Sequence, residues 1–416
     1  MIGVGVSELW LMLAALVILV LGSILSFKYS KLGFYTAIVA LILGLLACRS
    51  TYYGSFIFAI GVINLVSLEA IKSEIKGVDY GLVGLMALAT MYIFNTSDLS
   101  LVLASLVLVS VPTYVLVMIR EGGANVELGV KYIVFMVFAT VLFLIGAIIL
   151  AAKIESMYII GYVMLILGLA LEVGVAPLHV WVPDVFASAD PIPISIIGSM
   201  AKILPFIAAI KILISTSCPP LTETITLFTA IIAGISMFTG NIGALTAKEH
   251  GRVLGYSTVA NMGYVLSCIV AIAKPEFICV ALTGGLLMLF SNAAGKIGFF
   301  NAIKGKGAYS PLMYVLAFSF IGVPPLLGFW GKLFIILSLV EVGYIWLAVI
   351  LVINSAISVP YYTRLARELG IGWKANIANF VCIAVVVITL VTIVPPNWFV
   401  GGVKILVQNM GLAIGV

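Results

Sequence analysis

Apolar stretches of about 20 residues follow one another along this chain, and only short polar loops separate them. About 20 consecutive apolar residues are what a helix needs to cross the hydrocarbon core of a bilayer. The sequence is 63% hydrophobic and 9% charged, a balance that lies outside soluble globular usage. We therefore expect an all-α, polytopic membrane protein without a soluble domain.

The apolar pattern predicts about fourteen membrane crossings. The first stretch has no basic flank and no small-residue cleavage site, so we expect it to remain as a span and not to be a signal peptide. The tail, residues 397–416, is expected to lie at the membrane surface. The expected spans are residues 8–26, 33–48, 53–71, 80–96, 99–119, 128–152, 156–187, 191–215, 222–246, 253–273, 277–303, 308–338, 342–366 and 376–396.

Two of these spans, residues 156–187 and 308–338, are too long for one straight crossing, and both contain prolines. Proline lacks a backbone donor and clashes with the preceding helical turn. Non-helical backbone at membrane depth is tolerated where it is buried in protein or lines a hydrated cavity. We expect these two spans to be discontinuous helices.

The two broken spans carry nearly the same residues, GVAPL from Gly174 and GVPPL from Gly322. The separation of 148 positions is enough for about five helices with their loops. An odd number of helices makes the second copy enter the membrane from the opposite face, which is the inverted-repeat plan of many transporters. The expected units are N-terminal helices (1–79), a first five-helix repeat (80–215), a second five-helix repeat (222–366) and a C-terminal helix with a tail (367–416).

Basic residues indicate the orientation of this arrangement, because lysine and arginine gather in cytoplasmic loops. With both termini outside, most basic residues fall in inner loops, which supports an even number of crossings. The net charge of +5 is then a topology signal and gives no indication of nucleic-acid binding. The inner set is Lys28, Lys31, Lys72, Lys76, Arg120, Lys248, Arg252, Lys304, Lys306, Arg364, Arg367 and Lys374, and the outer set is Arg49, Lys153, Lys274 and Lys404.

Three lysines lie deep in the apolar spans, away from the span ends: Lys202, Lys296 and Lys332. A charged side chain at mid-membrane costs roughly 2.5–3.5 kcal/mol on insertion scales, and such residues usually pair, face a hydrated interior and serve ion movement. Glu172 is the one carboxylate deep in the seventh span, and we expect it to pair with Lys202. Lys211 lies near the outer end of its helix and is expected to extend its amine to the surface. The three lysines predict a charge-conducting path.

Other polar residues leave two interpretations open. His179 is either a proton relay or a hydrogen-bonded packing residue, and Asp184 either joins the path or marks a turn. Glu127 and Lys131, four residues apart on one helix face, form either a solvated pair or part of the coupling. Hydroxyl and amide groups on the tenth span either hold ordered water or join helices, and they belong to Ser257, Thr258, Asn261 and Tyr264.

The sequence gives no indication of a cofactor. The five cysteines form no CxxC pair, and the two histidines are 71 positions apart, His179 and His250, so neither metal nor iron–sulfur spacing is present. The sequence also contains no Walker loop and no GxGxxG that follows a strand. We expect this chain to bind no cofactor, so that any redox chemistry belongs to a partner.

Several segments stand in an order that resembles a known family: VKYIVF, PLHVWVPDVFASADPIPIS, AK, GRVLGYSTVANMGY and GVPPLLGFWGK. The family is that of the antiporter-like membrane subunits of complex I, energy-converting hydrogenases and multisubunit sodium/proton antiporters. The opening SELWLMLAALVILVLGS looks most like subunit N of complex I. The resemblance runs over nearly the whole chain. It implies a fourteen-helix fold with two inverted five-helix half-channels that a polar axis joins at mid-membrane.

The resemblance also implies roles for single residues. Lys202 matches the relay lysine of the eighth helix, and Lys332 matches the lysine of the twelfth helix that leads outward. Lys296 falls where antiporter-type relatives carry a lysine in a motif like HALFKALLF, with Asn292 in place of the histidine.

Two positions depart from the family pattern. LVLVSVPTY resembles the family's LELLSLPLY and puts Val107 where the family has a glutamate, and Glu172 stands where it has the seventh-helix lysine. The usual uptake pair is therefore missing. The first half-channel is either rearranged, with Glu172 as a partner of Lys202, or no longer conducts.

We expect a proton- or sodium-translocating subunit of a membrane-bound redox complex in the cell membrane, either an energy-converting hydrogenase or a complex I-like quinone oxidoreductase. Its expected partners are other membrane subunits, peripheral iron–sulfur subunits and the lipid bilayer. In this interpretation Lys202 is the central relay, Lys296 the bridge, Lys332 the exit-side carrier and Glu172 a partner. Two alternatives stay open: a non-conducting structural or assembly subunit, and a stand-alone secondary transporter.

Overall fold

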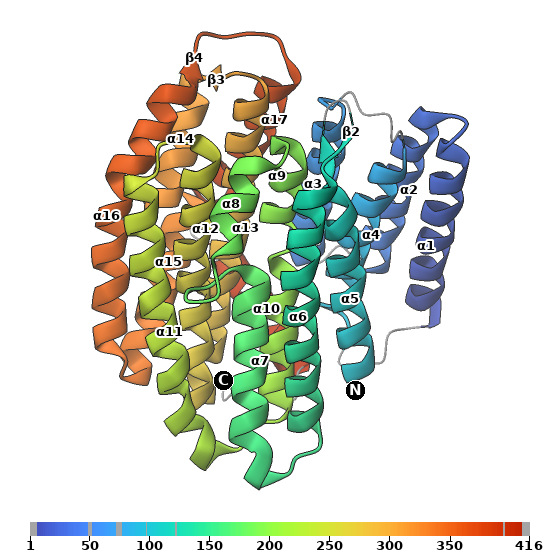
Figure 1. The fold of residues 1–416 in the computed structure, drawn as a ribbon. Coiled ribbons are helices and arrows are strands. Elements are labelled where there is room, and N and C mark those ends of the chain that lie inside the picture. Colours follow the sequence, from blue (N-terminus) through green and yellow to red (C-terminus); the bar gives the residue numbers. More distant parts are fainter. Residues whose placement is uncertain are drawn as a thin grey trace.

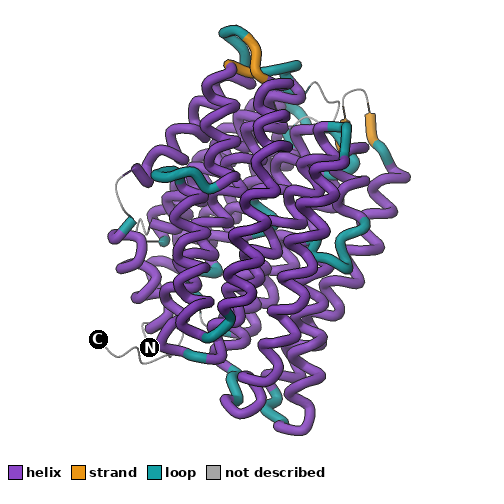
Figure 2. The backbone as a smooth tube through the Cα atoms, turned by 90° about the vertical axis from the view of Figure 1, so that its left-hand side faces the viewer, coloured by secondary structure: helices purple, strands orange, loops and turns teal. Residues whose placement is uncertain are grey.

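The computed structural model describes residues 6–48, 52–71, 77–96, 98–120, 123–393 and 396–409. Helices form nearly all of this part of the chain, as the sequence predicts. Figure 1 shows them running between an upper and a lower end, and Figure 2 shows most loops gathered at those two ends. Three basic residues of the topology argument, Arg49, Lys72 and Lys76, lie outside the described residues.

Five helices form the N-terminal part of the fold. Asp98 caps the last of them, because its carboxylate accepts hydrogen bonds from the backbone N–H groups of Ser100 and Leu101. A two-residue hairpin, β1 (Ile119–Arg120) with β2 (Gly123–Ala124), follows at the upper end. The five helices are α1 (Val6–Ser26), α2 (Ser30–Ala47), α3 (Tyr52–Leu68), α4 (Val78–Tyr92) and α5 (Leu99–Leu116).

The middle of the chain contains the first broken span. The structure divides it into α7 and α8, which a non-helical segment separates, and the following span into α9 and α10. These elements are α6 (Val126–Ala151), the 3₁₀ turn η1 (Glu155–Met157), α7 (Tyr158–Val173), α8 (Trp181–Ser188), α9 (Pro191–Ser199), α10 (Ile203–Ser215) and α11 (Pro219–Thr246).

The remaining elements contain the second broken span, α14 and α15. A second small strand pair, β3 (Ala308–Tyr309) beside β4 (Gly370–Ile371), joins two loops at the upper end. The helices are α12 (His250–Ser267), η2 (Cys268–Ala273), η3 (Pro275–Phe277), α13 (Ile278–Lys304), α14 (Ser310–Ile321), α15 (Leu327–Val342), α16 (Ile345–Leu369), α17 (Ile377–Leu390), η4 (Val391–Ile393) and α18 (Asn397–Asn409).

Both predicted helix breaks are present and have the same local geometry. α7 ends at Gly174 with φ 84° and ψ 49°, and α14 ends at Gly322 with φ 92° and ψ 43°. This left-handed conformation at a helix end favours glycine, which has no Cβ to clash with the preceding turn. α7 rises from the lower end and α14 descends from the upper end, and both stop inside the molecule (Figure 1).

A further interruption, which the sequence analysis did not predict, divides residues 191–215. α9 ends at Ser199 and α10 begins at Ile203, so that Lys202 lies in the non-helical turn between them. Pro205 explains this position. Its nitrogen carries no hydrogen to donate to the carbonyl of Ala201, four residues earlier, and its ring crowds that carbonyl.

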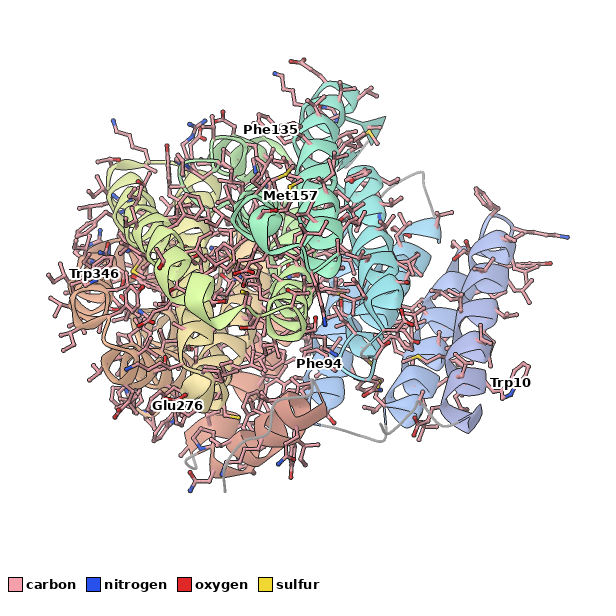
Figure 3. The ribbon with its side chains drawn as sticks, turned by 90° about the horizontal axis from the view of Figure 1, so that it is seen from below. Trp10, Phe94, Phe135, Met157, Glu276 and Trp346 are labelled. Atoms are coloured by element: carbon pink, nitrogen blue, oxygen red, sulfur yellow. The ribbon has the colours of Figure 1, made fainter. Side chains whose placement is uncertain are left out.

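By length and composition, ten helices of the described residues can cross a membrane, or up to eleven if the bent pair formed by residues 377–393 and 397–408 counts as one span. Three further apolar helices are shorter: Tyr52–Leu68, Val78–Tyr92 and Ser310–Ile321. Outer helices turn large apolar side chains outward, with Trp10 66% exposed, Phe138 59% and Ile345 58%. Figure 3, seen from below, shows Trp10, Phe135 and Trp346 at the periphery. The protein is thus a multi-span membrane protein.

The basic residues of the described chain are distributed unequally between the upper and the lower end of the molecule. The α1–α2, α11–α12, α13–β3 and α16–α17 connections lie at the upper end, and α6–α7, α10–α11 and α15–α16 lie at the lower end (Figure 1). Two ion pairs join upper-end elements: Arg252–Asp184 at 2.9 Å and Lys304–Asp190 at 2.7 Å. Asp184 therefore lies in a surface ion pair at a helix end.

The buried core centres on α9, α10, α12 and α13. Along α13 nearly every residue is buried, because α9, α12, α14, α15 and α17 all pack against it. Lys296 lies within this helix and Lys202 at the end of its neighbour α9. The architecture therefore brings two of the three candidate lysines into the most enclosed layer of the molecule.

Substitution of Gly174 tests the geometry of the first break. A Cβ at Gly174 would lie 2.3 Å from Val182 Cγ2, in addition to the left-handed φ of 84°. We expect Gly174→Ala to lower the unfolding midpoint in detergent by more than Gly343→Ala, which has φ 98° but open space and should lose only about 1–2 kcal/mol. Gly372→Ala, with open space and no left-handed φ, is the neutral control. Equal midpoints for Gly174→Ala and Gly372→Ala would contradict the assigned conformation.

Candidate functional site

Lys202 lies at the end of the broken helix α7. Its Nζ donates a hydrogen bond to the main-chain carbonyl of Glu172 at 2.9 Å and lies 4.7 Å from the ring centroid of Trp181. The Trp181 Nε1 donates to the carbonyl of Leu171 at 2.9 Å. Lys202 itself is 1% exposed. Side chains from α8 and from the α9–α10 turn thus satisfy carbonyl groups that the end of α7 leaves without helical partners.

The carboxylate of Glu172 points into a small cavity beside this amine. Its Oε1 accepts a hydrogen bond from Ser110 Oγ at 2.5 Å, and its Oε2 has no hydrogen-bond partner among the described residues. The expected pairing with Lys202 is therefore indirect: the amine bonds the carbonyl of Glu172, and the carboxylate bonds α5. The cavity has a volume of about 10 Å³, close to what one water molecule needs, and is lined by Ser110, Thr113, Tyr132, Met136, Glu172, Ala201 and Lys202.

On α5, Ser110 takes the position that faces Glu172. Val107, where the family resemblance leads to a glutamate, is 38% exposed, whereas Ser110 is 4% exposed. The two positions lie three residues apart, and their different exposure shows how α5 is rotated. The α5 partner of the buried carboxylate is therefore a neutral hydroxyl.

Lys332 repeats the arrangement of Lys202 at the second break. Its Nζ donates to the carbonyls of Phe320 at 3.0 Å and Ile321 at 2.9 Å, the last residues of α14, and lies 4.8 Å from the ring centroid of Tyr264. The side chain is 5% exposed. A cation at a helix C-terminus interacts favourably with the helix dipole. In both halves, a lysine amine and an aromatic ring close the end of a broken helix.

Lys296 lies between these two sites on α13 and is completely buried. Its Nζ donates to the carbonyl of Leu254 at 2.6 Å and to Ser257 Oγ at 2.7 Å. One turn earlier, Asn292 donates from Nδ2 to the carbonyl of Gly198 on α9 at 3.0 Å. Lys296 is thus held by α12, and its helix is joined to the one that ends near Lys202.

Neutral polar side chains continue from Lys296 toward α16. Ser257 Oγ and the Tyr362 hydroxyl are 2.9 Å apart, and Asn261 donates to the same Tyr362 hydroxyl at 3.2 Å. The rings of Tyr362 and Tyr361 have centroids 4.4 Å apart. Of the two open interpretations for the tenth span, the structure places Ser257 and Asn261 in hydrogen bonds between helices.

A second group of hydrogen bonds surrounds Asn241 of α11. Tyr361 donates from its hydroxyl to Asn241 Oδ1 at 2.8 Å. The Asn241 Nδ2 donates to the Tyr264 hydroxyl at 3.0 Å and to Asn354 Oδ1 at 3.1 Å. Because Lys332 lies over the Tyr264 ring, this group connects α16 with the second helix break. Together with Ser257, Asn261 and Tyr362, these residues form what we call the central polar layer.

The sequence analysis did not identify Asn241, Asn354, Tyr361 and Tyr362 as members of this layer. A signal was present, since an asparagine and two adjacent tyrosines interrupt the apolar span 342–366. Tyrosine is common at membrane interfaces, so its depth in the membrane follows only from the packed structure.

Three candidates lie away from the buried lysines. Glu127 and Lys131 form an ion pair at 2.8 Å with side chains 81% and 67% exposed, at the start of α6 near the upper end. His179 lies in the break after α7, half-buried, 6.4 Å from the Tyr256 ring, and its Nδ1 has no hydrogen-bond partner among the described residues. Among the described residues, no hydrogen bond, ion pair or ring contact connects any of them with the central polar layer.

Lys211 differs from the expectation that its amine reaches the surface. It is 7% exposed, and its Nζ donates to the carbonyl of Thr96 at the α4–α5 connection. The loop carbonyl supplies the partner that interfacial water supplies to a snorkelling lysine.

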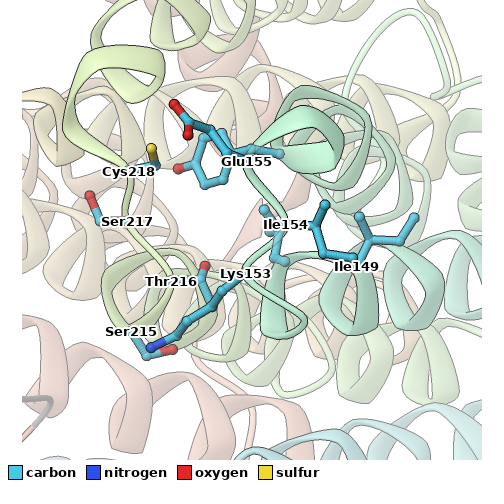
Figure 4. A pocket seen from close by; sticks show the side chains of 10 residues that line it. Ile149, Lys153, Ile154, Glu155, Ser215, Thr216, Ser217 and Cys218 are labelled. Carbon is cyan, nitrogen blue, oxygen red and sulfur yellow. The ribbon is translucent and has the colours of Figure 1, made fainter.

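A pocket of about 360 Å³ opens at the lower end, between the α6–α7 and α10–α11 connections. Figure 4 shows its lining, which includes Lys153, Glu155, Ser215 and Cys218. These loops lie at the lower end, and none of the three buried lysines lines the pocket, so the pocket belongs to the surface and not to the buried path. Among the described residues no group of three or more His, Cys, Asp or Glu side chains could hold a metal ion.

Known proteins with similar sequences belong to a family of membrane proteins. Residues 96–358 match the family described as NADH:quinone oxidoreductase/Mrp antiporter, transmembrane. The chain is 30% identical over 322 residues to NADH-quinone oxidoreductase subunit N of Thiobacillus denitrificans, covering 69% of this chain and 65% of that protein. Subunit N of Herminiimonas arsenicoxydans is 28% identical over 364 residues, or 77% and 74%. The chain thus spans about two thirds of the length of the first of these relatives.

Solved structures share the fold at low sequence identity. A chain of the Mrp complex from Dietzia sp. matches with a TM-score of 0.83 and 16% identity, covering 97% of this chain and 98% of that one. A chain of respiratory complex I from Thermus thermophilus matches with a TM-score of 0.73 and 22% identity, covering 94% and 98%. A chain of the archaeal membrane-bound sulfane sulfur reductase matches with a TM-score of 0.78 and 17% identity, covering 96% and 97%.

The hydrogen bond between Ser110 and Glu172 gives a stability prediction. Ser110→Ala leaves a buried carboxylate oxygen without a donor, which should cost about 1–3 kcal/mol of unfolding free energy. In a Glu172→Leu background the same change should cost much less, because the acceptor is absent. Thermal unfolding in detergent measures both. Ser105→Ala is the control, because the Ser105 hydroxyl bonds only the carbonyl of Leu101 in its own helix. An equal loss in both backgrounds would contradict the coupling.

Proposed function

Because this chain belongs to the NADH:quinone oxidoreductase/Mrp antiporter family of transmembrane proteins, we propose that it is an ion-translocating, antiporter-like subunit of a membrane-bound redox complex. It moves protons, with sodium as the alternative ion, while partner subunits transfer electrons. The complex is a quinone oxidoreductase like those that contain the subunit N relatives, or an energy-converting hydrogenase.

One observation carries this proposal: buried amines at two helix breaks flank a third amine, and polar side chains fill the layer between them. Lys202, Lys296 and Lys332 are each at most 5% exposed, and each donates to a main-chain carbonyl. Ionisable side chains inside a membrane usually mark ion pathways. Neutral amide and hydroxyl groups between them supply the donors and acceptors that a proton relay needs.

We assign one role to each of the buried ionisable residues, in the order in which they follow one another from the first helix break to the second. Glu172 is the acidic partner beside Lys202, which is the central relay. Lys296 is the bridge to the second half, and Lys332 is the exit-side carrier at the second break. Glu127, Lys131 and His179 were candidates for the same path. Their positions favour a solvated pair for the first two and a side position for His179.

We also propose that the fold has fourteen crossings in two inverted five-helix repeats. The ten long spans, together with α3, α4, the α14–α15 pair and α17, give this number. The opposite directions of α7 and α14 and their matching glycine ends support the inversion. The repeats comprise residues 80–215 and 222–366, with residues 1–79 before them and 367–416 after them.

The proposed location is the cell membrane, with both termini on the outer side. The concentration of lysine and arginine at the upper end supports an inward-facing upper end. Cleavage of the 248–252 segment by a protease added from outside would contradict this orientation. We propose other membrane subunits and peripheral iron–sulfur subunits as partners. We propose that electron transfer belongs to those partners.

A second candidate function is a structural subunit that keeps the fold without conducting. The neutral Ser110 opposite Glu172 favours it, because no acidic residue of α5 faces the first break. A stand-alone transporter, the third possibility from the sequence, has no such observation in its favour.

Removal of either break lysine distinguishes conduction from a structural role. We expect Lys332→Ala to reduce pumping by the reconstituted complex to below about one tenth, because it removes the proposed proton carrier and no other amine of the described residues bonds the end of α14. Electron transfer should stay largely intact. Lys202→Ala should act in the same way. Proton uptake into vesicles and electron-transfer rate, measured on the same sample, report both quantities.

Lys131→Ala is the matched control, because this lysine is exposed and pairs only with Glu127. Its pumping should equal that of the unmodified complex. Unimpaired pumping by both Lys332→Ala and Lys202→Ala in an assembled complex would favour the structural subunit.

A further inference from the structure

A second buried polar cluster lies between α3, α9 and α13, three helices that pack against one another (Figure 1). We call it the α3 cluster. It consists of side chains that are at most 1% exposed: Asn64 and Ser67 of α3, Ser195 and Ser199 of α9, and Asn301 of α13. None of these residues belongs to the lysine sites or to the central polar layer.

The donor groups of the α3 cluster form hydrogen bonds both between its helices and within them. Asn64 Nδ2 donates to Ser199 Oγ at 3.1 Å, and Asn301 Nδ2 donates to Ser67 Oγ at 3.1 Å. The hydroxyls of Ser67 and Ser199 donate to carbonyls of their own helices at 2.9 Å and 3.2 Å. These contacts join α3 to both α9 and α13.

Three oxygen atoms of the cluster have no partner among the described residues: Asn64 Oδ1, Asn301 Oδ1 and Ser195 Oγ. A buried acceptor without a donor costs about 1–3 kcal/mol. If these polar residues served only to join helices, each acceptor oxygen would be expected to accept a hydrogen bond from a donor on a neighbouring helix. Three unpaired oxygens in one cluster therefore indicate a ligand that supplies hydrogen-bond donors.

The chemistry of the cluster favours water as this ligand. Buried waters typically make about three hydrogen bonds to groups that the protein leaves unsatisfied. A sodium ion would be held without an anionic ligand, since the five side chains are neutral, and an unpaired ion in a buried site is costly. The nearby Asp190 is already paired with Lys304.

The upper end of the cluster lies near the basic face of the protein. Ser195 follows Asp190 by five residues on α9, and Asn301 precedes Lys304 by three residues on α13. The ion pair between Asp190 and Lys304, at 2.7 Å, therefore lies about one helical turn above the cluster. Its side chains are 6% and 16% exposed.

The lower end of the cluster lies near two of the candidate lysines. Lys202 follows Ser199 by three residues, in the turn after α9, and Lys296 precedes Asn301 by five residues, between one and two turns along α13. The Lys296 stem passes beside α9, because a Cβ on Gly198 would lie 3.6 Å from Lys296 Cγ. The cluster thus spans the distance between the upper face and the lysine layer.

We propose that ordered water bound to Asn64, Ser195 and Asn301 forms a proton uptake route from the upper face to Lys202 and Lys296. The route passes between α3, α9 and α13, apart from the α5–α7 cavity in which Glu172 faces a neutral serine. It supplies the first half of the protein with an uptake path that needs no carboxylate on α5. This inference rests on the proposed function, since it specifies how protons reach the relay.

Side-specific cysteine labelling tests whether water reaches the cluster. In the assembled complex, methanethiosulfonate ethylammonium added at the upper face should modify Ser195→Cys at least about tenfold faster than Ile194→Cys, because the reagent needs a hydrated thiolate. Ile194 is the matched control, since it is the adjacent residue and equally buried at 0%. Mass spectrometry of the peptide that contains the new cysteine separates its modification from that of native cysteines. Equal rates for the two variants would overturn the proposal.

Removal of the unpaired acceptors tests whether the route carries protons. Asn64→Leu and Asn301→Leu keep the side-chain size and should lower pumping several-fold at unchanged electron-transfer rate. Full pumping by both variants would overturn the route. If the unmodified complex pumps no protons, the proposed function fails, while the labelling rates still decide whether the cluster is hydrated. If the leucine variants fail to assemble, the labelling comparison alone decides the proposal.

Discussion

Unpaired carbonyl groups at the ends of interrupted helices are the constraint on which this structure depends. In a bilayer, water cannot satisfy them, so the protein must. Lys202 bonds the carbonyl of Glu172 at the end of α7, and Lys332 bonds those of Phe320 and Ile321 at the end of α14. At each break the lysine amine donates hydrogen bonds to the helix-end carbonyls. In turn, the partial negative charge at the helix C-terminus stabilises the ammonium group. The same interaction that stabilises the fold keeps an amine buried inside the molecule.

Between the two breaks, Lys296 is surrounded by neutral polar groups. Lys296 is held by Ser257, and Ser257 contacts the Tyr362 hydroxyl. Hydroxyl and amide groups both donate and accept, so they can pass hydrogen bonds along without the desolvation cost of another ion. Such a layer links α11, α12, α13 and α16 into one unit. The buried amines are therefore few, and neutral hydroxyl and amide groups lie between them.

The sequence was sufficient to predict features that repeat or that break a rule. Prolines in long apolar spans predicted both discontinuous helices, and lysines in apolar segments predicted the buried amines. Helix rotation could not be predicted in the same way: Val107 and Ser110 lie on one helix, and only packing shows that Ser110 faces Glu172. The interruption at Lys202 follows from Pro205, whose effect on a carbonyl four residues earlier is easy to overlook. The side-chain partners of Asn241 and Tyr362 lie 23 to 120 positions away in sequence, so no local pattern predicts them.

We propose that protons pass through the central polar layer between Lys296 and the second helix break. The most direct measurement is the number of protons pumped per electron pair by a reconstituted complex with Tyr362→Phe, which removes one hydroxyl and no charge. Tyr158→Phe, which removes a buried hydroxyl bonded to Thr222 near the lower end, is the reference. We predict that Tyr362→Phe lowers this ratio while Tyr158→Phe preserves it. An unchanged ratio for Tyr362→Phe in a fully assembled complex would contradict the passage of protons through the central polar layer.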